Sequence, residues 1–388
     1  MSVKPAGNLK EVALLFLRLG ATSFGGPAAY IGLMHHEVVV RRRWMDESRF
    51  LDLMSATMLL PGPNATEIAS HLGLVRAGWL GLIAAGGLFI LPGMAAIMVV
   101  AWAYVKYGSL PEVTWILYGV KPAVIAIIIQ AIWSLGRRGI KGALSVIVAL
   151  AVLVLHLFGV NEIVLLLAGA AAVVLIRGGR RLIRRGSPVA LIVPLLLKTS
   201  AVGLSTGAVA FSQTTLFLTF LKIGATLFGT GYVLLAFLRS NFVTSLGWLT
   251  DAQVIDAIAV AGQITPGPVF TSVAFVGYLL GGWPSALLAT LGIFLPSFLF
   301  VGLLSRILPL IRKTWWAASF LDGVNAAALG LIATVAIQLG RVVLVDVFSI
   351  VITVAALFLV FRFKTNSVWL VLGGGALGAI YHLVAYFT

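Results

Sequence analysis

The sequence predicts an all-α polytopic membrane protein with two inverted-topology repeats, about ten spans and a re-entrant Pro-Gly-Pro helical hairpin in each half. Three observations predict this fold class: an excess of apolar residues, a repeat with one fixed offset, and a Pro-Gly-Pro motif at the same place in each repeat. The chain is 61% hydrophobic and 10% charged, whereas soluble chains are about 45–50% apolar and about 25% charged. The additional apolar surface is expected to contact lipid, so the lipid bilayer is an expected partner of the chain.

Two stretches of ten residues show the repeat most clearly. Residues 16–25 read FLRLGATSFG and residues 220–229 read FLKIGATLFG, with seven identical positions at an offset of 204. The same offset recurs at Trp44/Trp248, Asp52/Asp256, Gly78-Trp79/Gly282-Trp283, Leu91-Pro92/Leu295-Pro296, Gly119-Val120/Gly323-Val324 and Gly136/Gly340. Each half is therefore expected to be one structural unit.

The repeat predicts that the chain has three parts: an N-terminal membrane repeat (1–176), a basic cytoplasmic linker (177–188) and a C-terminal membrane repeat (189–388). The linker contains GGRRLIRRGSP, which is too polar to cross a bilayer.

A span needs about 20 apolar residues, and each half contains five candidate stretches. In the first half they lie near 11–35, 78–105, 114–135, 142–157 and 161–176. In the second half they lie near 213–237, 284–308, 316–338, 343–361 and 367–387. An odd number of spans per half inserts the two halves in opposite orientations. The basic clusters between spans fit the cytoplasmic side of a multi-pass protein in the cell inner (cytoplasmic) membrane.

A different element lies between the first and second spans of each half. Residues 45–60 fit one short helix, followed by Pro61-Gly62-Pro63 and a helical stretch over 64–75. Twelve helical residues rise about 18 Å, too little for a hydrocarbon core of about 30 Å. We predict a re-entrant hairpin with Pro-Gly-Pro at its tip. Its counterpart runs over 250–280 around Pro266-Gly267-Pro268, at an offset of 205.

The two Pro-Gly-Pro motifs are the first candidate substrate-binding site. Paired broken helices are typical of secondary transporters, in which half-helix N-termini point at the substrate. Helices beginning at Asn64 and Val269 would direct free N–H groups toward an anion. Thr66 and Thr271, at matching positions, would add hydroxyl donors. The alternative is that each motif only makes a tight turn, with Asn64 as a cap.

Glycine-rich breaks interrupt the first span of each half, at Phe24-Gly25-Gly26-Pro27 and at Phe228-Gly229-Thr230-Gly231. Glycine lets the backbone approach a ligand closely, so Phe24, Gly25, Gly26, Pro27 and Gly229 join the candidate substrate-binding residues. The alternative is close packing of membrane helices.

Arg18 and Lys222 occupy matching positions six residues before these breaks. A cation inside a membrane helix is costly and normally functional, so the pair would neutralise a dianion between the halves. The alternative is that both side chains snorkel toward an interface. Lys121 and its repeat partner Asn325 are weaker candidate anion contacts.

Glu67 and His71 are four residues apart and share one helix face directly after the first tip. Their repeat partners, Ser272 and Val276, do not titrate. Glu67 and His71 are therefore candidates for proton coupling. The alternative is a structural pair whose hydrogen bonds are satisfied.

Composition and motifs exclude several other classes. The net charge of +15 is carried by basic clusters between apolar runs, which are expected to anchor the chain in the membrane and not to bind nucleic acid. Cysteine is absent and the five histidines show no ligand spacing, so we expect no metal site and no cofactor. No Gly-x-Ser-x-Gly, His-Glu-x-x-His or Walker motif occurs. The chain is therefore not expected to be an enzyme, and its driving force would be an ion gradient or the membrane potential.

At these residues the sequence resembles the CHR family of chromate ion transporters in its long-chain, two-domain form. In the first half the matching text is FLRLGATSFGGPAAYIGLM, RRRWMDESRFLDLMSATMLLPGPNATEIASHLG, RAGWLGLIAAGGLFILPG and YGVKPAV. In the second half it is FLKIGATLFGTGYVLL, WLTDAQVIDAIAVAGQITPGPVFTSVAFVGYLLGG and DGVNAAALGL. The resemblance covers nearly the whole chain.

The resemblance implies export of chromate from the cytoplasm, which confers chromate resistance, with sulfate as the chemically similar oxyanion. It implies function in the FGGP and PGP motifs of the first half, which here are Phe24–Pro27 and Pro61–Pro63 with Asn64 adjoining. The second half departs from FGGP at Thr230 and Gly231. We therefore expect most of the substrate site in the first half.

Together these observations predict a secondary transporter that exports chromate or a sulfate-like tetrahedral oxyanion, held near the half-helix N-termini between the repeats. One alternative is a passive anion channel of the same fold. Another is an intramembrane enzyme or lipid-handling protein, for which Glu67 and His71 would be the titratable cluster. The sequence leaves a homodimer open.

Overall fold

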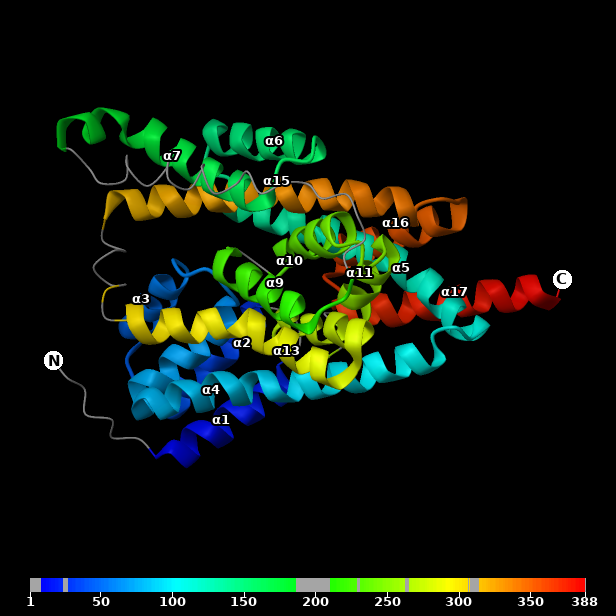
Figure 1. Ribbon diagram of the computed structural model, residues 1–388, viewed down its shortest axis with the longest axis horizontal. Helices are drawn as coiled ribbons and strands as arrows, with labels where there is room; N and C mark the ends of the chain where they lie inside the picture. The colour runs from blue at the N-terminus through cyan, green and yellow to red at the C-terminus, as the bar shows by residue number, and fades with distance from the viewer. Residues whose placement is uncertain are drawn as a thin grey trace.

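The computed structural model describes residues 8–23, 27–185, 210–228, 231–261, 265–305, 307 and 314–387. These residues form helices and their connections, with no strand among them, so the prediction of an all-α chain is confirmed. Long helices lie side by side along the longest axis of the molecule (Figure 1). Five helices of the described ranges are long and apolar enough to cross a membrane, which fits a polytopic membrane protein. The total of ten spans stays a prediction.

The helices of the two halves follow the same order, with α3 matched by α11 and η3, and α4 matched by η4 and α13. The first half contains α1 (Leu9–Thr22), α2 (Pro27–His35), the π-helix η1 (His36–Arg41), α3 (Glu47–Thr57), α4 (Asn64–Tyr107), α5 (Pro111–Gly139), α6 (Ala143–Leu157) and α7 (Glu162–Arg185). The second contains α9 (Gln213–Thr226), α10 (Val233–Leu238), η2 (Arg239–Ser245), α11 (Asp251–Asp256), η3 (Ala257–Ala261), η4 (Val269–Thr271), α13 (Ser272–Leu304), α15 (Trp315–Val343), α16 (Val347–Phe363) and α17 (Ser367–Phe387). The helix pairs α1/α9 and α5/α15 begin and end 204 residues apart.

Helix α4 is a hairpin of two helical legs. Ala77 and Gly78 leave the helical conformation, with φ −138° and +66°. A Cβ on Gly73 would lie 2.1 Å from the Gly81 carbonyl oxygen and 2.6 Å from Ala85 Cβ. Residues eight apart on a straight helix are separated by about 12 Å, so the chain must double back here. We call residues 64–77 the short leg and residues 78–107 the long leg.

Helix α13 turns back in the same way at Gly281 and Gly282, with φ −161° and +69°. A Cβ on Gly277 would lie 2.4 Å from the Ser285 carbonyl oxygen. Glycine supplies the positive φ of each turn without steric cost. The sequence therefore predicted the helical segments on both sides of each Pro-Gly-Pro to within a few residues. Whether the predicted hairpins with Pro-Gly-Pro at their tips are re-entrant stays a prediction.

The long legs of α4 and α13 pack on each other in opposite directions. A Cβ on Gly86 would meet the Phe298 ring at 2.4 Å, and one on Gly302 would meet the Trp79 indole at 2.3 Å. Residue numbers rise along one leg as they fall along the other, so the legs are antiparallel. This matching pair of helices thus runs in opposite directions where the two halves meet.

The two halves are also interleaved. Helix α5 packs on α16 and α17 of the second half, and its counterpart α15 packs on α6 and α7 of the first. Small residues make these crossings close: a Cβ on Gly119 would lie 2.0 Å from the Gly374 carbonyl oxygen. Helix α7 continues to Arg185, through most of the stretch predicted as a linker, and residues 186–209 lie outside the described ranges.

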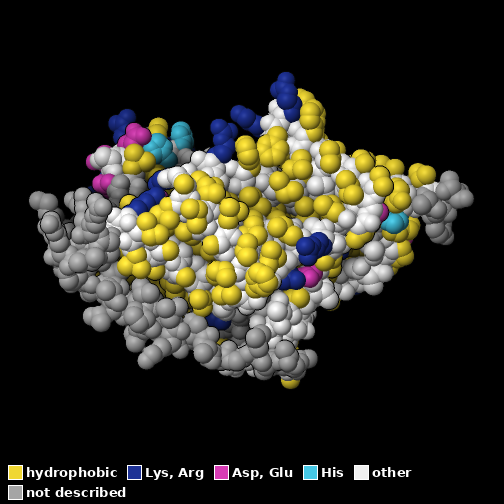
Figure 2. Space-filling view, turned by 90° about the horizontal axis from the view of Figure 1, so that it is seen from above, with side chains coloured by type: hydrophobic (Ala, Val, Ile, Leu, Met, Phe, Trp, Pro, Cys, Tyr) yellow, Lys and Arg dark blue, Asp and Glu magenta, His cyan; other side chains and the backbone are white. Residues whose placement is uncertain are grey.

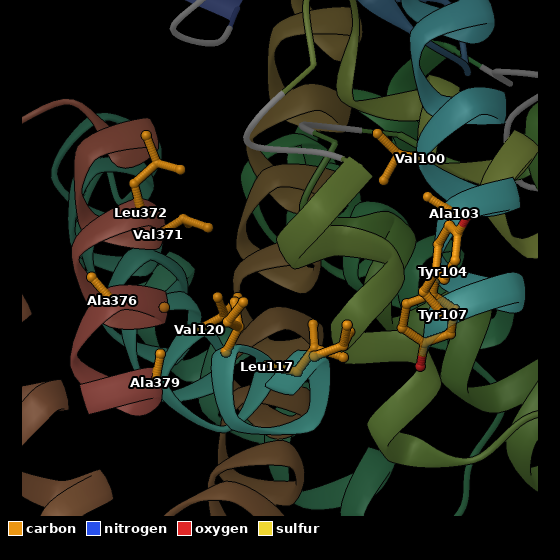
Figure 3. Close-up of a pocket in the computed structure, with 13 residues that line it drawn as sticks. Val100, Ala103, Tyr104, Tyr107, Leu117, Val120, Val371, Leu372, Ala376 and Ala379 are labelled. Carbon is orange, nitrogen blue, oxygen red and sulfur yellow. The ribbon is translucent and has the colours of Figure 1, made fainter. Parts of the chain in front are cut away.

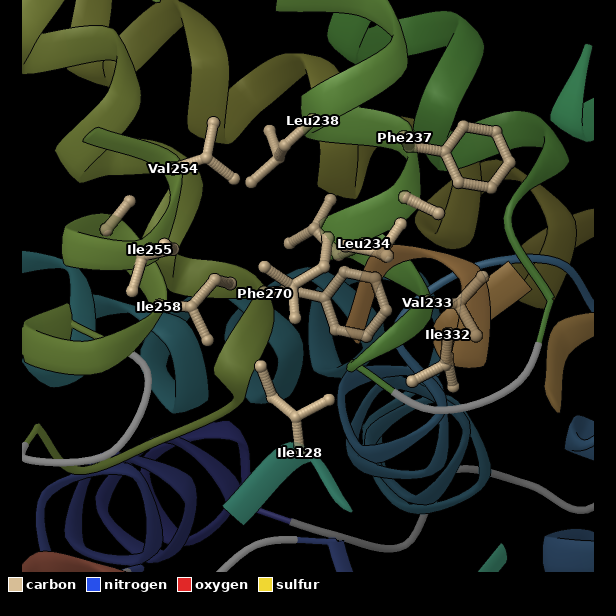
Figure 4. Packing of buried hydrophobic residues seen from close by; sticks show 14 of the residues in the cluster. Ile128, Val233, Leu234, Phe237, Leu238, Val254, Ile255, Ile258, Phe270 and Ile332 are labelled. Atoms are coloured by element: carbon tan, nitrogen blue, oxygen red, sulfur yellow. The ribbon is translucent and has the colours of Figure 1, made fainter. Parts of the chain in front are cut away.

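The surface and the core are both apolar. Hydrophobic side chains cover much of the face seen in Figure 2. Inside, α10, α11 and η3 are enclosed by one hydrophobic cluster, to which α5 and α15 contribute Ile128 and Ile332 (Figure 4). The matching segment of the first half is more open, with Val40, Leu51 and Met58 exposed. The two halves therefore differ in how deeply they bury the helices that lead to the Pro-Gly-Pro tips, α3 in the first half and α11 in the second.

Candidate functional site

Each Pro-Gly-Pro tip is hydrogen bonded to the break in the first helix of the other half. The Gly62 N–H donates to the Leu227 carbonyl oxygen over 2.7 Å, and the Gly267 N–H donates to the Ser23 carbonyl oxygen over 2.9 Å. Ser23 and Leu227 are the residues that end α1 and α9, at matching positions. Both tips therefore lie at the interface between the halves, each against a broken helix.

The first tip is surrounded by buried polar groups. Thr66 and Glu67 are fully buried in the first turn of the short leg, and His71 follows one turn later at 7% exposure. Ser297, on the long leg of α13, donates to Glu67 Oε1 over 3.1 Å. Among the residues that the structure describes, four buried polar atoms here have no hydrogen-bond partner: Asn64 Oδ1, Thr66 Oγ1, Glu67 Oε2 and His71 Nδ1. Buried polar groups in proteins are normally paired, so these atoms are available to a bound ligand or to ordered water.

The helix start at this tip adds further donors. The first N–H groups of a helix have no partner inside the helix and carry the positive end of its dipole. The short leg begins at Asn64, directly after Pro63, and is 14 residues long before its turn. The arrangement can therefore hold an anion with backbone N–H groups and the Thr66 hydroxyl, and with the Glu67 carboxyl group only when that group is protonated.

The second tip is similar but has no carboxyl group. Tyr30 donates to the Gly267 carbonyl oxygen over 2.7 Å, and the Thr271 hydroxyl donates to the Pro268 carbonyl oxygen over 2.6 Å. Ser23 Oγ and Ser272 Oγ are buried and have no hydrogen-bond partner within the described ranges. Thr271 is thus occupied by its own turn, unlike Thr66.

Several predicted site residues lie outside the described residues: Phe24, Gly25, Gly26 and Gly229. Pro27 begins α2, and its side chain is not described. Pro61, Pro63, Pro266 and Pro268 flank the two tip glycines. Arg18 and Lys222 are exposed, so the structure does not place them in the buried cluster. Their exposure fits both the predicted anion contact and the alternative of snorkelling.

Lys121 is engaged by a carboxylate of the other half. Its Nζ lies 3.5 Å from Asp256 Oδ1, and the Tyr104 hydroxyl donates to Asp256 Oδ2 over 2.8 Å. Asp256 is 2% exposed, so this is a buried ion pair that joins α5 to α11. Asn325, the repeat partner of Lys121, is exposed.

Ser297, Ser23 and Tyr30 belong to the site but were not predicted. Ser297 and its repeat partner Gly93 both follow the repeated Leu-Pro pair, and a Cβ on Gly93 would lie 2.4 Å from the Pro266 carbonyl oxygen. The matching small residues were the available signal. Within the described ranges, no group of three or more metal-ligating side chains occurs.

One cavity of about 550 Å³ lies apart from the tips, between α4, α5 and α17. Its lining is apolar, with Val100, Leu117, Val120 and Leu372 among the side chains that face it (Figure 3). The described lining has no charged side chain and its polar side-chain groups are two tyrosine hydroxyls, of which that of Tyr104 already donates to Asp256. It therefore offers an anion no compensating charge, and the cavity is not a candidate oxyanion site.

The sequence is similar to known transporters. The profile of the chromate transporter family matches residues 10–174 and again residues 214–379, so the second match begins 204 residues after the first. The chromate transport protein of Cupriavidus metallidurans is 33% identical over 384 residues, which cover 98% of this chain and 94% of that protein.

Two further relatives cover most of the chain. The probable chromate transport protein of Synechococcus elongatus is 34% identical over 92% of this chain and 91% of its own length. The chromate transport protein of Pseudomonas aeruginosa is 31% identical over 97% of this chain and 93% of its own length. No solved structure shows significant similarity to the chain.

Proposed function

Because this chain belongs to the chromate transporter family, a family of transporters and not of enzymes, we propose that it is a secondary carrier that exports chromate or a sulfate-like tetrahedral oxyanion. The protein is a multi-pass membrane protein of helical fold. In this proposal it lies in the inner membrane, and an ion gradient or the membrane potential drives export.

The observation that carries the proposal is the contact of each tip with the broken helix of the other half. A helix N-terminus is equivalent to roughly half a positive charge. Two tips then supply about one positive charge for a dianion. At the first tip the Thr66 hydroxyl, which has no partner among the described residues, can donate to an oxyanion, and Glu67 can do so only when protonated. The oxyanion would sit there, between the halves.

The antiparallel packing of matching helices supports an inverted-topology arrangement of the two repeats. A carrier with inverted repeats exposes one central site first to one side and then to the other by rocking or gating of one repeat. The unequal burial of α3 and α11 fits a conformation in which only one side is closed. Glu67 and His71 are the proposed proton-coupling groups. Arg18 and Lys222 are the proposed cations on the path by which the oxyanion approaches the site.

Transport into everted membrane vesicles tests the proposal. Uptake of labelled chromate should saturate, require an imposed gradient or potential, and be blocked by excess sulfate. Vesicles from cells that lack the protein are the control. Uptake that neither saturates nor responds to a gradient would contradict a carrier and favour a passive anion channel.

A further inference from the structure

The two tips are matched in position but differ at two residues that touch them. Glu67 of the first half corresponds to Ser272, and Ser297 of the second half corresponds to Gly93. A Cβ built on Gly62 would lie 2.7 Å from Glu67 Oε1 and 2.2 Å from Ser297 Oγ. Both polar groups are thus in contact with the first tip, and the second tip has neither.

Of the two oxygens of the Glu67 carboxyl group, one accepts a hydrogen bond and the other does not, in the part of the chain that the structure describes. Oε1 accepts a hydrogen bond from the Ser297 hydroxyl, and Oε2 is buried without a partner among the described residues. An ionised carboxylate accepts hydrogen bonds and cannot donate one, whereas a protonated carboxyl donates through its O–H. The protonation state of Glu67 therefore decides whether Oε2 repels an oxyanion or binds one.

No cation of the described residues is paired with Glu67. The other charged or titratable groups on the legs of α4 and on the described elements packed against them are Lys10, Glu11, Arg18, Tyr30, His35, Glu47, Arg49, Asp52, His71, Arg76, Tyr104, Lys106, Tyr107 and Tyr278. Of these, Arg76 and Glu11 form a salt bridge with each other, and the positive charge of Arg49 interacts electrostatically with His71. Glu67 is the buried carboxyl group at the first tip.

We infer that Glu67 takes up a proton when the oxyanion binds at the first tip, and that its protonated carboxyl then donates a hydrogen bond from Oε2 to an oxyanion oxygen. This inference rests on the proposed function. The proton comes from solvent, forms an O–H bond at Oε2 and leaves as the anion leaves. Ionised Glu67 excludes a dianion from the tip by like-charge repulsion in a low-dielectric site. The loaded carrier then moves one dianion and one proton together, with a net charge of −1.

Binding of labelled sulfate to the purified protein tests the inference, because sulfate stays a dianion where chromate itself can take up a proton. Where Glu67 is ionised in the empty protein, the affinity should fall about tenfold for each unit of rising pH, the linkage of one proton. The measurement covers about pH 6 to pH 10, on both sides of neutrality. Calorimetry in buffers with different ionisation enthalpies should count one proton taken up per anion.

Four variants complete the experiment, and the fourth, His71→Gln, tests the neighbouring titratable side chain. Glu67→Gln keeps an N–H donor but cannot titrate, and its sulfate affinity should be independent of pH. Glu67→Ser reproduces the residue of the second tip and should lose the pH dependence as well. Asp52→Asn changes an exposed carboxyl group on α3, the arm that leads to the same tip, and should keep the wild-type slope.

The outcomes separate this inference from the proposed function. A flat wild-type profile, a slope that survives Glu67→Gln, or a slope lost in His71→Gln but not in Glu67→Gln would overturn the role of Glu67. In each of those cases saturable oxyanion binding still supports the carrier. Absence of saturable binding of both sulfate and chromate at every pH would contradict the proposed function itself.

Discussion

Gly62 shows how one residue shapes the site. Its φ of +133° is a conformation that only glycine adopts readily. A Cβ there would press on Ser297 and Glu67, whereas the nearest atom to a Cβ on Gly267 is 3.5 Å away. The sequence predicted both tip glycines from the doubled motif, since a motif is local. It did not predict Ser297, because its contact with Gly62 depends on how the halves pack.

Replacing the tip glycines tests this difference. Gly62→Ala should lower the free energy of unfolding by about 1–3 kcal/mol from backbone strain and by about 1–3 kcal/mol more from overpacking. Gly267→Ala should suffer the strain but not the overpacking. Thermal unfolding in detergent measures both variants, and an equal loss in the two would contradict the packing described at the first tip.

Arg18 and Lys222 were predicted as substrate cations, and the structure leaves that prediction open. We expect Arg18→Gln to weaken the apparent affinity for chromate, because a cation near the approach raises the local anion concentration. Arg18→Lys should restore it, and the unfolding temperature should change little, because the side chain is exposed. Unchanged affinity in a well-expressed Arg18→Gln protein would favour the snorkelling interpretation.

At the scale of elements, the hairpins follow from local chemistry. The arm α3, the tip and the short leg of α4 were predicted because proline stops the preceding helix and the stretch after it is short. The turn at Gly78 and the return of the long leg agree with the predicted start of the next span near residue 78. The sequence did not show that α7 continues to Arg185, into the predicted linker, because basic residues also suit the last turn of a helix.

The ion pair between α5 and α11 gives a prediction at this scale. Asp256→Asn should cost about 3 kcal/mol, the lower end for a broken buried pair, because Lys121 is 24% exposed. Adding Lys121→Gln should recover part of the loss, since no unpaired charge then remains. Asp251→Asn, in a more exposed pair with Arg239, is the matched control. Denaturant unfolding in detergent should rank the variants in that order, and an equal cost for the two aspartates would contradict it.

At the scale of the whole molecule, the matching long legs of α4 and α13 run antiparallel and the halves interleave. The offset of 204 predicted that matching helices exist, because each half repeats one pattern. It could not predict that α5 packs on α16 and α17, since nothing local encodes which half supplies a helix's neighbour. It also could not predict the unequal burial of α3 and α11, which is a property of one conformation.

Single cysteines test the orientation of the halves in the membrane, because the chain has none of its own. Lys141 and Val345 are repeat partners in exposed connections, at 61% and 69% exposure. With inverted repeats, a membrane-impermeant maleimide should label Lys141→Cys and Val345→Cys from opposite sides of the membrane. One of the two variants should be labelled in intact cells and the other in everted vesicles. Labelling of both from one side would contradict the inverted arrangement.

The central claim is that the oxyanion binds where the two tips meet the broken helices, and a structure with bound chromate tests it most directly. The anomalous signal of chromium should lie beside the first tip, within hydrogen-bond reach of the first N–H groups of the short leg, Thr66 and Glu67. A signal confined to the apolar cavity between α4, α5 and α17, or to any place away from both tips, would contradict the account.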